Sequence, residues 1–168
     1  HYMKVKTLGQ GQHGNATLLA DPNTFNLVVV KEVPVTNLNS FEKEHLETEV
    51  AMLRSFQHEN IIAYHGYFHR NDNLSIVMEY APGGTLAAMI ARQTDTGVPF
   101  PTDLVRVWSA QLASAMRYVH NQRILHRDLS TSNVFLGRNS EIKLGDFGIA
   151  HRMNTMAGNM AETICGTP

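Results

Sequence analysis

Apolar and polar residues alternate along residues 4–33, a period-two pattern that predicts β-strands. The alternation is interrupted by "GQGQHG" at residues 9–14 and by "DPNT" at residues 21–24, and both segments are typical of turns. Because strands joined by short turns pair antiparallel, we expect three antiparallel strands, the third of which is "NLVVVKEV".

A helical period replaces the alternation in residues 41–54, where Leu46, Val50 and Leu53 fall on one stripe of an α-helix. Two further strands are expected around "IIAYHGYF" and "LSIVMEY", which are rich in β-branched and aromatic residues. The first part of the chain is therefore predicted to be a five-stranded antiparallel sheet with one helix.

The segment "APGGT" at residues 81–85 breaks the pattern and predicts a linker. A short helix is expected near residues 86–93, and a long one from about Leu104 to His120. The apolar positions of the long helix recur at helical spacing and are Leu104, Trp108, Leu112, Ala115 and Val119. Short strands are expected near "ILHRD", "NVFLG" and "IKLGD". A sheet-rich part followed by a helical part is an α+β fold.

The composition is that of a globular domain, with 168 residues, of which 43% are hydrophobic and 17% charged. The net charge of −1, without blocks of like charge, does not favour nucleic acid or anionic lipid as a partner. No apolar run approaches the roughly 18 residues of a membrane span. The start, "HYMKVKTLGQ", lacks the apolar stretch of a signal peptide, and the single Cys165 fits a reducing compartment, so we expect a cytoplasmic protein.

Gly9, Gly11 and Gly14 form a glycine-rich turn, in which backbone amides can approach phosphates without obstruction by a Cβ atom. Alone, such a turn is equally well explained as a hairpin without a ligand. A dinucleotide-binding turn would open a helix, whereas the β-type segment "NATLLA" follows here. The sequence therefore favours a hairpin that covers a nucleotide.

Lys31 lies between two valines on one face of its strand, where an ammonium group needs solvent or an anionic partner. Glu49 falls on the apolar stripe of the predicted helix, whereas Glu47 is expected on another side, nearer Lys43. Two opposite charges on two core-facing surfaces suggest a Lys31–Glu49 ion pair. The alternative is that each side chain reaches water separately.

The segment "HRDLSTSN" at residues 126–133 and the later "DFG" contain Asp128, Asn133 and Asp146. One carboxylate and one amide oxygen, together with nucleotide phosphates, suffice as magnesium ligands. Asp128 would then orient an acceptor hydroxyl and accept its proton. A lone "DFG" is explained by a simple turn, but the ordered series GxGxxG, Lys, Glu, HRDxxxxN, DFG is the pattern of protein kinases.

Over its whole length the chain resembles the eukaryotic protein kinase domain, and it is most similar to the NIMA-related serine/threonine kinases. The stretches that carry the second resemblance are Ala16, "VVVKEV", "NVFL", "IKLGDFGIA" and "ETICGTP". The resemblance implies a bilobal kinase-like fold. Residues 1–81 would form the N-lobe with the glycine-rich loop, the lysine strand and helix C. Residues 82–168 would form the exit of the hinge and a partial helical C-lobe that reaches the activation segment.

The resemblance also assigns roles to individual residues. The nucleotide-binding residues would be Gly9, Gly11, Gly14, Ala16, Val29, Lys31, Met78, Glu79, Ala81 and Phe135. The catalytic residues would be Asp128, Lys31, Glu49 and Asn133, and the metal ligands would be Asn133 and Asp146. Met78 would be the gatekeeper, and backbone groups of Glu79 and Ala81 would bind adenine. The implied cofactors are ATP and Mg²⁺, with Mn²⁺ as an alternative metal.

Further implied features are a regulatory spine and a phosphorylation site. The spine would consist of Leu53, Tyr64, His126 and Phe147. Thr163 would be the activation-loop phosphosite, with Arg127 as the partner of the phosphate; the alternative is an unmodified hydroxyl in a loop. Thr167 favours a serine/threonine kinase over a tyrosine kinase. Ile149 follows "DFG" directly, and in the family a β-branched residue at this position goes with a preference for threonine as the acceptor.

The sequence departs from the family pattern at several positions. Ser130 replaces the usual lysine of the catalytic loop, Thr85 replaces an acidic residue that often contacts ribose, and His13 replaces an aromatic residue. The sequence given stops at Pro168, inside the activation segment, so we expect it to be part of a longer protein.

The leading hypothesis is a protein serine/threonine kinase that uses ATP and a protein substrate, with an activating or scaffolding protein as a further partner. The resemblance implies a cytoplasmic location, at the cytoskeleton or a microtubule-organising centre, with the nucleus as an alternative. The rival hypothesis is a pseudokinase or a nucleotide-binding regulatory module. A dinucleotide-dependent oxidoreductase does not fit the strand after "GQGQHG".

Overall fold

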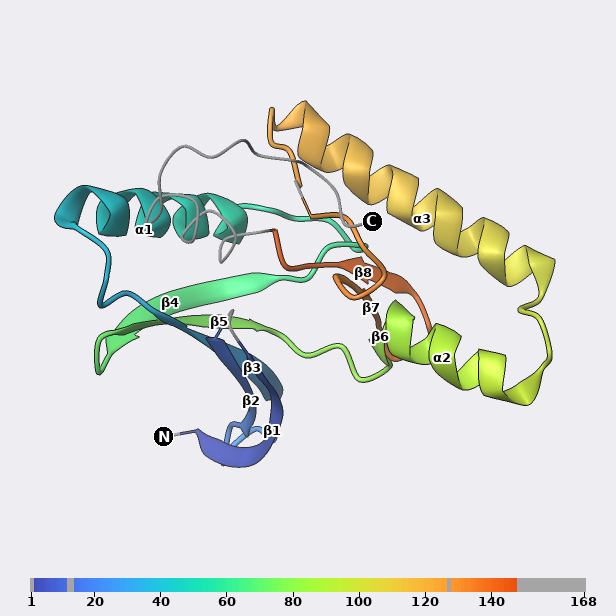
Figure 1. The fold of residues 1–168 in the computed structure, drawn as a ribbon, viewed down its shortest axis with the longest axis horizontal. Coiled ribbons are helices and arrows are strands. Elements are labelled where there is room, and N and C mark those ends of the chain that lie inside the picture. Colours follow the sequence, from blue (N-terminus) through green and yellow to red (C-terminus); the bar gives the residue numbers. More distant parts are fainter. Residues whose placement is uncertain (1, 12–13, 127, 148–168) are drawn as a thin grey trace. The chain divides into compact units, whose positions relative to one another are not determined.

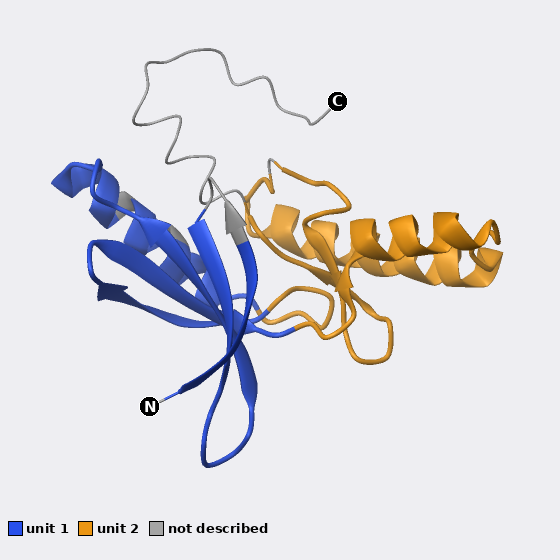
Figure 2. Cartoon of the chain, turned by 60° about the horizontal axis from the view of Figure 1, so that its bottom comes forward, with its two compact units in different colours: residues 1–56, 63–80, 148–163 blue, residues 57–62, 81–147, 164–168 orange. Residues whose placement is uncertain are grey.

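The computed structural model describes residues 2–11, 14–126 and 128–147. These residues divide into two compact units, one within residues 1–56 and 63–80, and the other within residues 57–62 and 81–147 (Figure 2). Each unit has its own sheet, and each is described by itself. The domain boundary expected after residue 81 stays a prediction.

The first unit is built on a five-stranded sheet in the order β1-β2-β3-β5-β4 (Figure 1). Its strands are β1 (Met3–Gly11), β2 (Gly14–Ala20), β3 (Leu27–Pro34), β4 (Tyr64–Arg70) and β5 (Asn73–Glu79). All neighbouring pairs are antiparallel, as predicted. Asn71 and Asp72 join β4 to β5 with φ angles of 46° and 58°, the geometry of a tight two-residue hairpin turn.

Helix α1 (Ser40–Arg54) packs against β4 of this sheet. A capping box opens it, because the Asn39 side chain accepts a hydrogen bond from the Glu42 backbone N–H and the Glu42 side chain accepts one from the Asn39 N–H. Its apolar stripe of Leu46, Val50 and Leu53 is buried. The predicted helix and its core-facing stripe are therefore confirmed.

The second unit contains a three-stranded sheet in the order β6-β7-β8, together with two helices (Figure 1). Its elements are β6 (Gly84–Thr85), α2 (Leu86–Thr96), α3 (Thr102–Asn121), β7 (Val134–Leu136) and β8 (Ile142–Leu144). Helix α3 packs against β8 and buries Trp108, Ala115 and Val119, as its apolar spacing predicted. No helix in the described ranges has the length and apolar character needed to cross a bilayer.

The strand expected near "ILHRD" is wrong for the described residues of that segment, which are irregular. Strand β7 instead pairs with β6, which lies inside the segment predicted as a linker, through Gly84 opposite Leu136 and Thr85 opposite Phe135. The other edge of β7 is taken by β8. Helix α2 also extends to Thr96, beyond its predicted end, and stops at Gly97, whose φ of 68° is left-handed.

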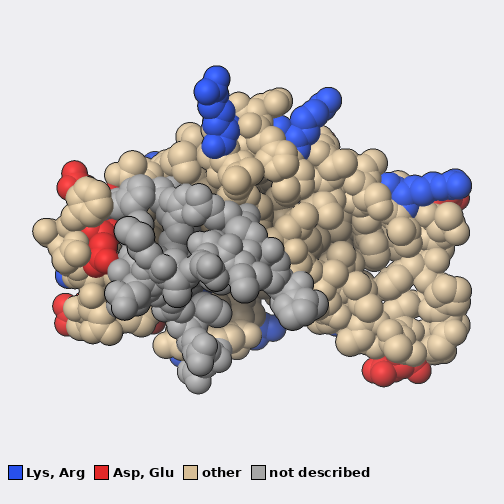
Figure 3. Space-filling model, turned by 45° about the horizontal axis from the view of Figure 1, so that its top comes forward, with Lys and Arg blue, Asp and Glu red and all other residues tan. Residues whose placement is uncertain are grey.

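Charged side chains of both signs are scattered over the described part of the face shown in Figure 3. Lys and Arg side chains stand apart from one another on this face rather than gathering in a patch. This distribution agrees with the small net charge of −1.

Candidate active site

Asp128 is held by Asn133, five residues further along the loop that precedes β7. The Asn133 side-chain N–H groups donate to the backbone oxygen and to a carboxylate oxygen of Asp128, both at 2.8 Å. The Asn133 backbone N–H donates to the Ser130 carbonyl oxygen at 3.0 Å, which closes the loop between them. Because Asn133 is buried and β7 starts at the next residue, the sheet fixes the amide that orients the Asp128 carboxylate.

Asp146 follows β8 and is tied to the same asparagine through Gly145. The Gly145 N–H donates to the Asn133 backbone oxygen at 3.0 Å. A Cβ atom on Gly145 would lie 2.9 Å from the Ile62 side chain and 3.0 Å from the Phe135 ring, so a larger residue would crowd this junction. Asp146 itself has a φ of 52°, an uncommon conformation for a residue other than glycine that often marks functional sites.

Asn133 and Asp146 have the donor chemistry of a magnesium site. The amide nitrogen of Asn133 is engaged by Asp128, which leaves the amide oxygen as the atom suited to a cation. The Asp146 carboxylate would add a second oxygen ligand, and magnesium prefers oxygen ligands completed by water and phosphate oxygens. Across the described ranges, His, Cys, Asp and Glu form no group of three or more that could hold a metal by themselves.

His126 is buried behind this loop and packs on Phe147, with ring centroids 4.6 Å apart. Its Nε2 lies 2.9 Å from the Gly145 carbonyl oxygen, which can only accept, so Nε2 carries the proton. Its Nδ1 is buried without a hydrogen-bond partner in the part of the chain that the structure describes. Burial lowers the pKa of His126, and this effect outweighs the Gly145 hydrogen bond and the charges of Asp128 and Asp146, which act to raise it.

The glycine-rich turn lies in the first unit, with Gly9 and Gly11 in β1 and Gly14 at the start of β2. Gly14 has a φ of 100°, and a Cβ atom there would overlap the backbone oxygen of Glu32. Gly14 is therefore required by the hairpin itself. A Cβ atom on Gly9 would approach no other described part of the chain within 4 Å, so the fold does not explain the glycine there, and its phosphate-binding role stays a prediction.

Four of the predicted nucleotide-binding residues share one face of the first sheet. Cross-strand partners lie on the same face, and Ala16 is opposite Lys31 while Val29 is opposite Met78. Because Val29 and Lys31 are two residues apart on β3, all four side chains belong to that face, and all are half-buried. Glu49 lies on α1, but its side chain is outside the described part of the structure, so the Lys31–Glu49 ion pair stays a prediction.

Glu79 and Ala81 already make contacts within their own units. Glu79 donates its backbone N–H to the Ala63 oxygen at 2.8 Å, and its carboxylate accepts the Ala63 N–H at 3.1 Å. In the second unit, the Ala81 oxygen accepts the Gly84 N–H at 3.3 Å, and Phe135 lies on β7. The side-chain role of Glu79, which fastens the end of β5 to the segment before β4, was not expected from the sequence.

Thr85 caps helix α2. Its hydroxyl oxygen accepts the Ala88 backbone N–H at 3.1 Å, which satisfies one of the unpaired N–H groups of the first helical turn. The capping role of Thr85 was not predicted from the sequence, in which Thr85 stands out as the substitute for a ribose-binding acidic residue. A threonine directly before a helical pattern is an N-cap signal that could have indicated this role.

The protein kinase domain family model matches residues 2–168. The chain belongs to the protein kinase domain family. Among its curated relatives, serine/threonine-protein kinase Nek9 of Mus musculus is 42% identical over 168 residues, which are 100% of this chain and 17% of that protein. Nek5 of Homo sapiens is 39% identical over 99% of this chain and 23% of its own length, and Nek1 of Mus musculus is 35% identical over 99% and 14%.

These relatives confirm the resemblance to the NIMA-related kinases and the kinase-like fold class. The chain spans less than a quarter of the length of each of these three proteins. The family assignment therefore describes the kinase domain and not the remainder of a longer protein.

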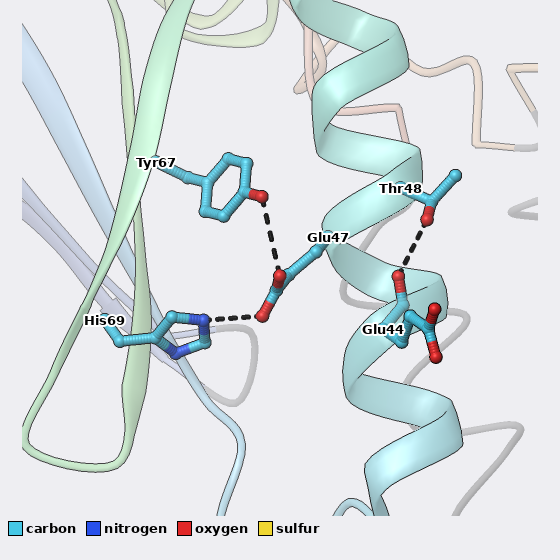
Figure 4. Close-up of polar contacts among 5 residues, drawn as sticks. All are labelled: Glu44, Glu47, Thr48, Tyr67 and His69. Atoms are coloured by element: carbon cyan, nitrogen blue, oxygen red, sulfur yellow. Dashed lines mark hydrogen bonds and ion pairs between the residues drawn. The ribbon is translucent and has the colours of Figure 1, made fainter.

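Glu47 of the kinase helix α1, which was expected near Lys43, makes contacts that were not predicted from the sequence. Its carboxylate lies 2.7 Å from the His69 Nε2 and accepts a hydrogen bond from the Tyr67 hydroxyl at 3.5 Å (Figure 4). Both partners lie on β4, so the carboxylate joins the helix to an edge strand of the sheet.

Several predicted kinase features fall beyond the part of the chain that the structure describes. His13, Arg127, Ile149, Thr163 and Thr167 lie outside the described residues. Of the predicted spine, Leu53 and Tyr64 are buried in the first unit, and His126 and Phe147 are in contact in the second. The spine as a whole stays a prediction.

Proposed function

We propose that this chain is the catalytic part of a protein serine/threonine kinase, which transfers the γ-phosphate of ATP to a protein hydroxyl group. The hydrogen bonds from Asn133 to Asp128 carry this proposal, together with the Gly145 N–H that links Asn133 to the residue before Asp146. They orient a carboxylate suited to act as a base, and they link the residue that orients it to the segment that carries Asp146, so that Asn133 and Asp146 are suited to supply oxygen ligands to magnesium.

Asp128 would orient the acceptor hydroxyl and accept its proton as the phosphate bond forms. Its amide partner Asn133 keeps the carboxylate in one orientation, which lowers the entropic cost of orienting the reacting groups for transfer. Magnesium, held by Asn133 and Asp146, would neutralise charge on the nucleotide phosphates. Lys31 would add a positive charge to the phosphates from the first sheet.

By the family resemblance, adenine would contact Ala16, Val29, Met78 and Phe135. Apolar side chains suit the flat faces of a base, and backbone groups of Glu79 and Ala81 would bind its polar edge. The shared face of Ala16, Val29, Lys31 and Met78 supports this arrangement. The glycines Gly9 and Gly11 would admit the phosphates.

Regulation and specificity are proposed from the family resemblance. Phosphorylation of Thr163 would add about −1.5 to −2 charges, and Arg127 would pair with them. Ile149 favours threonine as the acceptor residue. A protein substrate, an activating or scaffolding protein, and a cytoplasmic site at the cytoskeleton or a microtubule-organising centre are further parts of this proposal.

Ser130 favours a second candidate function, a pseudokinase or nucleotide-binding regulatory module. A lysine at this position would hold the transferred phosphate, and losing one such contact costs on the order of 2.7–4 kcal/mol, or about a hundred- to a thousandfold in rate. Ser130 still contributes its backbone oxygen to the loop through the Asn133 N–H. The substitution therefore slows a kinase without removing its base or its metal ligands.

Two measurements on the intact protein separate these candidates. ATP binding is measured by titration calorimetry with and without Mg²⁺, and transfer of labelled γ-phosphate to a mixed protein substrate is measured under the same conditions. A kinase binds ATP with Mg²⁺ and transfers phosphate. A regulatory module binds the nucleotide and shows no transfer that exceeds a blank without enzyme.

A further inference from the structure

The carboxylate of Glu47 is held by two side chains of β4, each bound to a different oxygen atom. Oε1 lies 2.7 Å from the His69 Nε2, and Oε2 accepts the Tyr67 hydroxyl at 3.5 Å (Figure 4). Tyr67 and His69 are two residues apart on the strand, so they project from the same face, and their rings meet edge to face at 6.5 Å. The three side chains form one cluster between α1 and β4.

A second attachment of α1 is its apolar stripe of Leu46, Val50 and Leu53, which is buried. Apolar burial is non-directional, so it holds the helix on the sheet without defining its rotation closely. Hydrogen bonds weaken steeply when their geometry changes. The Glu47 cluster therefore supplies a directional constraint that the apolar stripe cannot supply.

We propose that Glu47 is a positioning residue, which His69 and Tyr67 hold so that α1 keeps one rotation about its axis. Glu49 lies on the same helix two residues later, and a rotation of the helix moves both residues together. The cluster would thus set the position of Glu49 relative to the sheet that carries Lys31. This inference rests on the proposed function, because Glu49 matters only if it partners a catalytic lysine.

The side chains of His69 and Glu47 are 51% and 36% exposed, so solvent screens the pair and its loss should loosen the helix rather than unfold the unit. A contact as exposed as this one corresponds to a change of about two- to fivefold in the equilibrium constant between the packed and the loosened helix. The effect is small enough that the variants fold and large enough to measure.

Glu47→Ala is compared with Glu44→Ala in the intact protein. Glu44 is a matched control on the same helix, since it is exposed, its carboxylate points away from Tyr67 and His69, and its backbone oxygen accepts the Thr48 hydroxyl at 2.9 Å (Figure 4). Hydrogen exchange of the amides in residues 40–54 is followed by mass spectrometry, and kcat and KM are measured for phosphate transfer. The double variant Glu47→Ala/His69→Ala shows whether the two residues act through one contact.

For Glu47→Ala we expect exchange in α1 to quicken by about two- to fivefold and kcat to fall by a similar factor, with the KM for the protein substrate unchanged. Adding His69→Ala should change neither quantity further, and Glu44→Ala should match the wild type. The proposal is overturned if Glu47→Ala and Glu44→Ala behave alike, or if exchange quickens while kcat stays the same. If the wild-type protein transfers no phosphate, the proposed kinase function is refuted. The positioning role of Glu47 is then tested by hydrogen exchange, and an unchanged exchange rate in Glu47→Ala would refute it.

Discussion

Asn133 donates its side-chain amide to both the backbone oxygen and the carboxylate of Asp128, at 2.8 Å each. A single buried side chain thus fixes the position of the loop and the orientation of its carboxylate. The backbone oxygen of the same asparagine accepts the Gly145 N–H at 3.0 Å, one residue before Asp146. The base and the two metal ligands proposed here are therefore connected by hydrogen bonds within one unit.

Asn133→Ala should remove both bonds to Asp128 and one of the metal ligands. Without them the carboxylate loses its orientation, and we expect kcat to fall by at least about a hundredfold. Steady-state phosphate transfer at saturating ATP and Mg²⁺ measures this effect. Asn139→Ala is the control, because Asn139 is exposed in the turn between β7 and β8, and it should leave kcat within about twofold of the wild type. Equal rates for the two variants would remove Asn133 from the mechanism.

Ser130→Lys should restore a positive charge beside the transferred phosphate. We expect kcat to rise by tenfold or more, up to the roughly hundred- to thousandfold value of one electrostatic contact, with the Kd for ATP unchanged. The backbone hydrogen bond between the Ser130 oxygen and the Asn133 N–H survives this substitution. Transfer kinetics and calorimetry on the same preparations measure the two quantities. An unchanged kcat would mean that another group already supplies this charge.

Thr85→Ala should destabilise the protein by about 1 kcal/mol, because the Ala88 N–H loses its cap. Thr85→Asp should keep the stability, since aspartate is a good N-cap and its charge suits the helix N-terminus. If this position lies beside the ribose, as the family resemblance implies, Thr85→Asp should also bind ATP more tightly than the wild type. Urea denaturation and ATP titration test the two expectations, and a Thr85→Ala protein as stable as the wild type would contradict the capping role.

The stability of the protein should fall as the pH drops below about 6.5, the ordinary pKa of histidine. Burial lowers the pKa of His126, so below that pH the unfolded chain binds a proton that the folded chain does not. For this one proton, the free energy of unfolding decreases by up to about 1.4 kcal/mol per pH unit until the lowered pKa is reached.

Urea denaturation at pH 7.5 and pH 5.5 measures this loss, and His126→Gln should reduce the difference between the two values. The control is His120→Gln, which replaces an exposed histidine on α3 and should keep the wild-type difference. The same pH dependence in both variants would show that His126 is not the group responsible.

The sequence predicted elements whose burial follows a regular period. The alternation in β2 and β3, where Leu18, Ala20, Val28 and Val30 are buried, follows from a single buried face, which a local pattern records. The stripe of Leu46, Val50 and Leu53 in α1 has the same origin. Strand β1 was predicted although Met3, Val5 and Leu8 are exposed. The apolar spacing of α3 was equally informative, and Trp108 is buried as expected. The order of the motifs also indicated the family, because the series GxGxxG, Lys, Glu, HRDxxxxN and DFG rarely arises by chance in a protein that is not a kinase.

Contacts between distant residues were not predictable in this way. Strand β6 consists of Gly84 and Thr85, and it exists because β7, about 50 residues further along the chain, offers it a partner. The clusters made by Glu47 with β4 and by Glu79 with Ala63 likewise depend on how segments pack, and local periodicity carries no record of them. Only the Thr85 cap had a local signal, which lies in its position before α2.

The most direct test of the proposed mechanism is Asp128→Asn in the intact protein, with Asp103→Asn on the exposed surface of α3 as the matched control. Asparagine has nearly the same shape but cannot accept the proton of the acceptor hydroxyl. We predict that kcat for phosphate transfer falls by about a hundredfold or more in Asp128→Asn, while the Kd for ATP stays within about twofold and Asp103→Asn matches the wild type. Undiminished phosphate transfer by Asp128→Asn would contradict the assignment of this loop as the catalytic site.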